Sequence, residues 1–362
     1  LRDLTDPSGG FYSAEDADSL LEHGRPEHAE GAFYVWTHKE IAELLGADAD
    51  VFCSHYWVKP NGNADDPHGE LTGKNILHVT RTVEDTAREF QRDPEAVSAA
   101  LERCRAALLA ARARRPRPHL DDKIICAWNG LMISALARAS QVLEEESYLE
   151  AARRAARFLQ ATLGNENRGT LARRYRDGQA AFEGYLEDYA FLAQGLLDLY
   201  EAGFELEWLR LAQRLTERMN ELFWDEDGGG FFATSGRDAS VLVRMKEDYD
   251  GAEPSGNSVA ALNLLRLGEM LNRSEWRQMA ERTFQAFSGT LSEHPHAVPQ
   301  MLVAFSFLED TPAQVVVAGE RDDPRTRALL RVVRERFLPN KVVLLADDAA
   351  RAALGPELPW LA

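Results

Sequence analysis

The sequence predicts a mainly α fold made of repeated helical hairpins, arranged as in an (α/α)6 toroid. Three segments carry this prediction, because in each an acidic or amide cluster leads into a helix rich in Ala and Leu: Asp121–Val142, Glu187–Ala202 and Glu253–Leu271. Both intervals between their starts, 121 to 187 and 187 to 253, are 66 residues long. Each segment is apolar on nearly all sides, which is typical of a helix buried on most faces. A closed ring of helices buries its inner helices more fully than a two-layer solenoid does, so the pattern favours the ring. The solenoid is the alternative interpretation.

A more amphipathic helix follows each apolar one, with Arg and Glu on one side. These helices are expected at Tyr148–Leu163, Leu206–Leu222 and Ser274–Phe287. Gly-rich aromatic stretches at Asp6–Ser19 and Asp225–Gly236 are typical of reverse turns with short hairpins. The pattern therefore predicts inner helices, outer helices and turns that return the chain to one end of the inner layer.

The first third of the chain is less regular. Gly31–Gly46 predicts a short strand and then a helix, with Thr37 as N-cap and Glu40 completing a capping box. Ala64–Lys74 is expected to be a polar loop, and Pro94–Arg115 a long Arg-rich helix.

The tail has a different pattern. Two β-branched runs, Gln314–Gly319 and Lys341–Asp347, flank a helical pattern at Thr326–Phe337, which predicts a β-α-β unit. We therefore expect a toroid over residues 1–310, with its first hairpins missing, and a small β-α-β appendage over residues 311–362.

Charge and composition exclude several classes of function. The 362 residues carry a net charge of −18, a field that repels nucleic acid and anionic membrane surfaces. No apolar run approaches the roughly 18 residues of a membrane-spanning helix. The three cysteines, Cys53, Cys104 and Cys126, are widely spaced, which suits a reducing compartment. We expect a soluble cytoplasmic protein without a cofactor or a bound metal.

The starts of the predicted inner helices would meet at one end of the ring, so their polar residues become candidates for a site. Paired carboxylates can act as acid and as base or nucleophile in glycoside cleavage. The candidate catalytic residues are Glu187, Asp188, Asp122 and Glu253. Helix capping is the alternative role for such acids at helix starts.

Aromatic rings and amides beside these carboxylates favour binding of a carbohydrate or a similar polyol. The candidate substrate-binding residues are Glu15, Asp16, Asp18, Trp128, Asn129, Tyr189, Asn257 and His296. Capping or core packing is again the alternative for several of them. His294 and His296 precede the next expected inner helix, where an imidazole base of a sugar epimerase or isomerase could act.

Six ordered motifs resemble the thioredoxin domain-containing family that includes spermatogenesis-associated protein 20. They run from end to end of the chain: GGFYSAEDADS (9–19), EGAFYVWT (30–37), DDKIICAWNGLMI (121–133), LEDYA (186–190), EPSGNS (253–258) and PNKVVLLAD (339–347). The resemblance implies a six-hairpin toroid similar to those of N-acylglucosamine 2-epimerases and family glycosidases. Family members also carry a thioredoxin-like domain and early helical segments, which this chain lacks, so we expect a fragment or a shortened relative.

Three functions stay open at this point. The first is a carbohydrate-binding protein that cleaves a glycosidic bond, and the second is a sugar epimerase or isomerase. The third is a non-catalytic scaffold that holds a thioredoxin-like domain or another protein partner.

Overall fold

The computed structural model describes residues 1–165, 169–239 and 241–361. Its contacts divide the chain into two compact units, a larger one formed by Leu1–Ser13 with Asp122–Ala362 and a smaller one formed by Ala14–Asp121. The sequence instead predicts a domain boundary at residue 310. That boundary stays a prediction.

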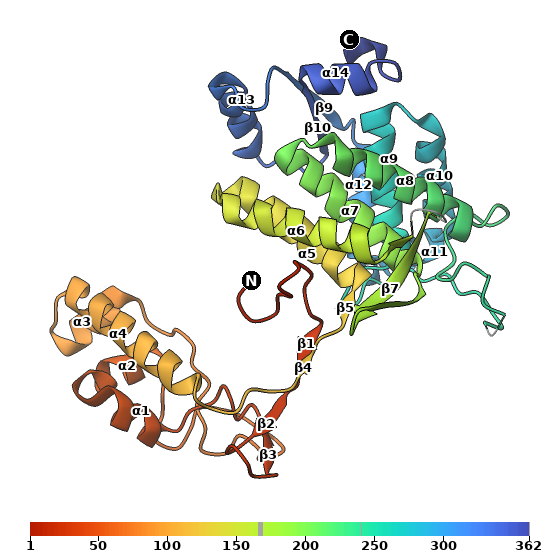
Figure 1. The fold of residues 1–362 in the computed structure, drawn as a ribbon. Coiled ribbons are helices and arrows are strands. Elements are labelled where there is room, and N and C mark those ends of the chain that lie inside the picture. The colour runs from red at the N-terminus through yellow and green to blue at the C-terminus, as the bar shows by residue number, and fades with distance from the viewer. Residues whose placement is uncertain (166–168, 240, 362) are drawn as a thin grey trace. The chain divides into compact units, whose positions relative to one another are not determined.

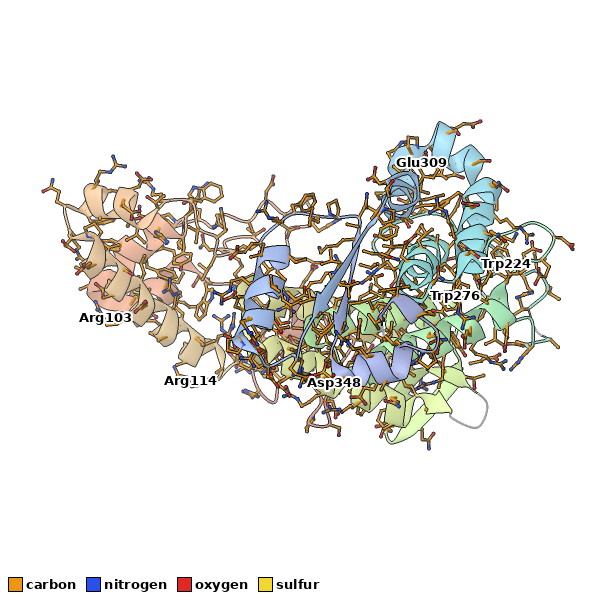
Figure 2. All side chains as sticks on the ribbon, turned by 90° about the horizontal axis from the view of Figure 1, so that it is seen from above. Arg103, Arg114, Trp224, Trp276, Glu309 and Asp348 are labelled. Atoms are coloured by element: carbon orange, nitrogen blue, oxygen red, sulfur yellow. The ribbon has the colours of Figure 1, made fainter. Side chains whose placement is uncertain are left out.

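The smaller unit has its own apolar core. Its helices are α1 (His38–Leu45), α2 (Ala49–His55), α3 (Val83–Phe90) and α4 (Pro94–Arg112), with a 3-10 turn at Gly46–Asp48. Strand β1 (Ala14–Glu15) pairs with β4 (Leu120–Asp121), and β2 (Asp18–Leu20) pairs with β3 (His28–Glu30). The predicted capping box of Thr37 and Glu40 is confirmed at the start of α1. Arg103 of α4, labelled in Figure 2, forms an ion pair with Asp48 at 2.8 Å.

The larger unit contains the predicted helical hairpins (Figure 1). The inner helices are α5 (Cys126–Leu143), α7 (Leu186–Gly203), α9 (Gly256–Leu271) and α12 (Pro299–Glu309). The outer helices are α6 (Glu146–Thr162), α8 (Leu206–Phe223) and α10 (Ser274–Ala286), and α11 (Ser288–Glu293) with a 3-10 turn at Pro295–Ala297 leads into α12. The predicted fold class, mainly α with hairpin repeats of the (α/α)6-toroid type, is confirmed.

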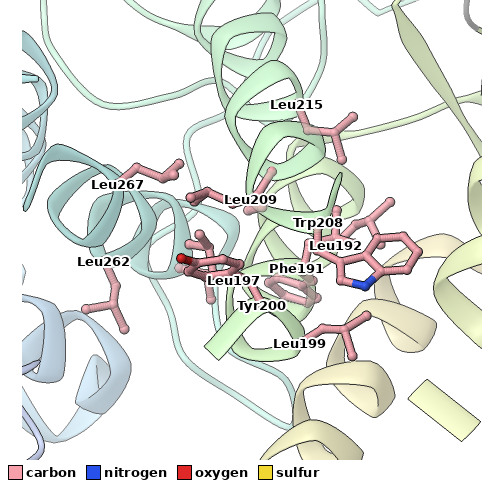
Figure 3. Packing of buried hydrophobic residues seen from close by; sticks show 14 of the residues in the cluster. Phe191, Leu192, Leu197, Leu199, Tyr200, Trp208, Leu209, Leu215, Leu262 and Leu267 are labelled. Atoms are coloured by element: carbon pink, nitrogen blue, oxygen red, sulfur yellow. The ribbon is translucent and has the colours of Figure 1, made fainter. Parts of the chain in front are cut away.

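Inner helix α7 lies in the middle of the helical layer and packs against α5, α8 and α9. Almost all of its side chains are buried, including Phe191, Leu192 and Tyr200. Figure 3 shows these side chains among Trp208 of α8 and Leu267 of α9. Each fully buried side chain of this size contributes roughly 1.5–3 kcal/mol. The all-round apolar pattern in the sequence therefore reflects burial on every side.

Two glycines let α5 and α7 approach closely. A Cβ on Gly130 of α5 would lie 2.5 Å from the carbonyl carbon of Phe191, and a Cβ on Gly195 of α7 would lie 2.5 Å from the carbonyl oxygen of Gly130. No side chain fits between backbones at this distance, so this helix contact depends on both glycines.

A β-hairpin between α6 and α7 was not predicted. Strand β7 (Thr170–Arg176) pairs with β8 (Gln179–Glu183), β6 (Gly164–Asn165) and β5 (Ile124–Ile125). The turn is Asp177-Gly178, in which both residues have positive φ, as a two-residue type I′ turn requires. This hairpin brings an arginine, Arg173, to the start of α7.

The predicted β-α-β unit is confirmed. Strand β9 (Ala313–Ala318) runs parallel to β10 (Lys341–Ala346), and α13 (Pro324–Arg334) connects them. Helix α14 (Asp348–Leu354) and a 3-10 turn at Pro359–Leu361 follow. Val342 and Leu344 belong to the same buried core as the helical hairpins. Among the residues that the structure describes, no helix combines the length and apolar character needed to cross a bilayer.

Candidate functional site

The N-terminal ends of the four inner helices meet, as the repeat spacing predicts. An Asp188 oxygen at the start of α7 accepts from the Ala127 amide of α5 at 3.0 Å. The Trp128 indole of α5 donates to Glu253, just before α9, at 2.9 Å. Asp250 accepts from the Gln300 amide of α12 at 2.8 Å. We call this part of the larger unit the N-terminal face.

Asp188 connects two helix starts from a fully buried position. Its second oxygen accepts from the Tyr185 amide at 2.9 Å and from Arg173 at 3.2 Å. Burial raises the pKa of its carboxyl to about 7, although Arg173 and the backbone amides favour the charged form. The side chain has no exposed surface, so a ligand outside the protein cannot touch its oxygens.

Glu187 and Asp122 are partly exposed carboxylates held by arginines of β7. Arg173 lies 2.8 Å from Glu187, whose side chain is 24% exposed, and its guanidinium also covers the ring of Tyr185. Arg176 lies 2.7 Å from Asp122. The hairpin therefore holds Glu187 by a charge-assisted hydrogen bond and Asp122 by an ion pair.

Trp128 forms one wall of an open cavity of about 540 Å³. The residue is 44% exposed, while its Nε1 donates to Glu253, which is itself exposed. Tyr12, Met132 and residues 1–4 are among the other residues that line this cavity. An exposed indole whose orientation is set by a hydrogen bond is a suitable stacking surface for an apolar ligand face.

Asn129 and Asn257 play the same part in two repeats, because each holds a Gly-Gly-Phe turn. The Asn129 amide accepts from the Phe11 N–H at 2.7 Å and donates to the carbonyls of Phe11 and Ile125. The Asn257 amide accepts from the Phe231 N–H at 2.7 Å and donates to the carbonyls of Phe231 and Glu247. Both side chains are buried, so their amides bind the protein's own backbone.

Tyr189 is also engaged within the core. It has no exposed surface, and its hydroxyl accepts from the Leu171 N–H at 2.8 Å. Burial raises the pKa of this phenol to about 12. Tyr189 therefore joins α7 to the β7 hairpin.

His294 and His296 are exposed on the segment that leads into α12. Their ring centroids are 6.2 Å apart. The Asp250 N–H donates to the carbonyl of Ala297 at 2.9 Å, which places the residue next to His296 beside the loop that carries Glu253. The described residues contain no cluster of three or more His, Cys, Asp or Glu side chains suited to a metal ion.

Glu15, Asp16 and Asp18 belong to the smaller unit, whereas the N-terminal face belongs to the larger one. Glu15 accepts from the Tyr34 hydroxyl at 2.6 Å, and Asp16 accepts from the Asp18 N–H at 3.2 Å. A role for these three acids in the same site stays a prediction.

Sequence reasoning missed Arg173, which contacts both Glu187 and Asp188. A signal was present, because the dipeptide Asp177-Gly178, typical of a two-residue hairpin turn, separates two short runs at 170–176 and 179–183. That pattern predicts the hairpin, but the pairing of β7 with β5 joins segments far apart in the sequence.

The chain is similar over nearly its whole length to proteins that are about twice as long. It is 42% identical to human spermatogenesis-associated protein 20 over 383 aligned positions, which cover 99% of this chain and 48% of that protein. The mouse protein of the same name is 40% identical with the same coverage. An uncharacterized protein of Caenorhabditis elegans is 35% identical, covering 99% of this chain and 51% of its own length. No family model matches the chain.

Solved structures share only a weak overall likeness. A cellobiose 2-epimerase of Bacillus thermoamylovorans has a TM-score of 0.39 and 15% identity, covering 46% of this chain and 44% of its own. A family 105 glycoside hydrolase of C. acetobutylicum has a TM-score of 0.40 and 12% identity, covering 58% of this chain and 61% of its own. Neither likeness assigns an activity to this chain.

Proposed function

We propose that this chain, which is similar over 99% of its length to spermatogenesis-associated protein 20, binds a carbohydrate or a similar polyol at the N-terminal face. The main support is Trp128, an exposed ring held by Glu253 beside an open cavity of about 540 Å³. A ring of this kind stacks on the apolar face of a pyranose, and the neighbouring carboxylates accept from its hydroxyls.

If the ligand is a substrate, the carboxylates suit cleavage of a glycosidic bond. One carboxylic acid protonates the leaving oxygen while a second carboxylate acts as base or nucleophile. The side chain of Glu187 is partly exposed and Glu253 is exposed, whereas Asp188 is fully buried. We therefore assign the reacting groups to Glu187 and Glu253, with Asp188 as a positioning residue and Asp122 as a further ligand contact.

An epimerase or isomerase is the second candidate function. It is favoured by the exposed pair His294 and His296, which adjoins the loop of Glu253. An imidazole there could remove a proton next to a sugar carbonyl. Incorporation of solvent deuterium at that carbon would separate this reaction from hydrolysis.

A thermal-shift screen against monosaccharides, disaccharides and sugar acids tests the binding proposal. A ligand raises the melting temperature of the state that it binds, increasingly with its concentration. We expect one sugar class to stabilise the wild type but not Trp128→Ala. Trp360→Ala is the matched control, because Trp360 is 48% exposed and lies outside the cavity.

Equal stabilisation of Trp128→Ala and the wild type would contradict the proposed site. No stabilisation by any sugar would favour the scaffold function, in which the chain acts with a thioredoxin-like domain or another protein. For catalysis, Glu187→Gln should lower turnover by about 10²-fold or more. Glu309→Gln, an exposed carboxylate on α12, should leave turnover unchanged.

A further inference from the structure

A second cavity, of about 470 Å³, lies in the larger unit, beside the inner helices but away from the N-terminal face. Its walls come from the inner helices α5, α7, α9 and α12 and from the stretch that runs from the end of α13 to the start of β10. Its size is within the usual range for small-molecule sites. None of its lining residues belongs to the N-terminal face, so it is independent of the proposed carbohydrate site.

One wall of this cavity is a buried ion network that is already neutralised internally. Asp198 of α7 accepts from Ser134 at 2.5 Å and from Arg138 at 3.0 Å, and it lies 2.9 Å from Arg266. Arg266 also reaches Glu201 at 3.1 Å. These contacts join α5, α7 and α9, and they leave the two carboxylates with cationic partners.

The opposite wall carries cations without such partners. Arg334 donates to the carbonyls of Glu201 and Ala202, and Lys341 donates to the carbonyl of Leu338. Among the residues that the structure describes, no carboxylate lies within ion-pair distance of either side chain. Burial lowers the pKa of both groups, because their charge is partly removed from water.

The cavity as a whole has an excess of positive charge in a strongly acidic chain. Its lining includes five basic residues and three acidic ones, and one of the five basic residues, Arg336, is exposed. Phe307, Leu262 and Val303 supply apolar surface between these charges. Guanidinium groups bind carboxylates and phosphates through paired N–H donors, and the apolar wall suits a compact organic body.

We propose that this cavity binds a small organic anion, with its carboxylate or phosphate group on Arg334, Arg336 and Lys341 and its apolar part against Phe307. The ligand supplies an anionic group at ion-pair distance from Arg334 and Lys341, whereas within the described residues Glu201 acts on both only from farther away. Binding also joins the β-α-β unit to the inner helices through one bound group.

Thermal-shift titrations of the full chain with benzoate and with phenyl phosphate test this proposal. Benzamide serves as the neutral probe of nearly the same shape as benzoate. We expect at least one anion to raise the melting temperature in a saturable way, and benzamide to have no such effect. Arg334→Gln with Lys341→Gln should weaken binding about tenfold or more, since each removes a charged donor.

Two further variants keep the test independent of folding. Arg336→Gln changes an exposed side chain at the cavity edge and should also weaken binding. Arg351→Gln with Arg214→Gln removes two exposed cations outside the cavity and should leave binding unchanged. Equal binding by Arg336→Gln and this control would overturn the proposal, as would the absence of any shift with both anions.

Discussion

At the residue scale, a few polar side chains organise the N-terminal face through contacts with the protein itself. Asp188 caps α7 and holds the start of α5, and Asn129 and Asn257 each hold a Gly-Gly-Phe turn. Trp128, which lines the cavity, and its hydrogen-bond partner Glu253 stay exposed beside this framework. The buried polar side chains therefore hold the helix starts and turns in place, and the partly exposed side chains are available to a ligand.

The raised pKa of Asp188 predicts a pH dependence of stability. The folded protein keeps a proton on this carboxyl up to about pH 7, whereas the unfolded chain releases it near the ordinary value of 3.8. The free energy of unfolding should therefore fall by up to about 1.4 kcal/mol per pH unit as pH rises between those values.

Denaturant unfolding of wild type and Asp188→Asn across this pH range checks the prediction. In Asp188→Asn, the free energy of unfolding should no longer show this decrease with pH. Asp348→Asn, which changes an exposed residue of α14, should still show it. A carbon NMR titration of the Asp188 carboxyl with a midpoint near 4 would refute the account of this residue.

Asn257 gives a second prediction at this scale. Asn257→Ala removes one acceptor and two donations to backbone groups, so the free energy of unfolding should fall by about 3 kcal/mol. Urea unfolding measures this loss, and Asn61→Ala, at an exposed position, is the control. A loss below about 1 kcal/mol would show that the amide does not hold the turn.

At the scale of elements, the helical hairpins were predictable because their signals are local. The predicted helix at Leu206–Leu222 differs from α8 by one residue. The first inner helix was predicted from Asp121 but begins at Cys126, because Ile124–Ile125 pair with β7. The pairing of two strands about 50 residues apart leaves no periodic pattern in the local sequence. The start of α5 at Cys126 and the position of Arg173 therefore could not be predicted from the spacing of apolar residues.

The close contact between α5 and α7 leads to a prediction about Gly195. Gly195→Ala should lower the free energy of unfolding by about 1–3 kcal/mol, because its Cβ would overlap the carbonyl oxygen of Gly130. Gly289→Ala is the matched control, since a Cβ at that helical glycine meets open space. Thermal unfolding compares the two variants, and equal stabilities would argue against the close approach.

At the scale of the whole molecule, the described residues form two separate buried cores. The toroid over residues 1–310 stays a prediction. Residues 14–121 enclose their own core around Ile41, Phe52 and Leu101. The first third was recognised as less regular, but apolar patterning does not show which distant segments share a core. The prediction that Glu15 and Glu187 belong to one site requires knowing which distant segments pack together, and apolar patterning does not give this.

Separate cores predict separate unfolding transitions. Ile41→Ala should lower the melting temperature of one calorimetric transition and Leu264→Ala that of the other, each by creating a cavity that costs about 2–5 kcal/mol. Differential scanning calorimetry distinguishes the two effects. A single transition that shifts equally in both variants would contradict two independent units.

The proposed carbohydrate site is tested most directly by the indole N–H resonances of the seven tryptophans during titration with the sugar found in the thermal-shift screen. Trp128→Phe assigns the resonance of Trp128. We predict that this resonance shifts in a saturable way, and that Glu253→Gln, which alters the partner of Nε1, weakens the binding. An unchanged Trp128 resonance while another tryptophan shifts, or no shift in any of them, would contradict a site at the N-terminal face.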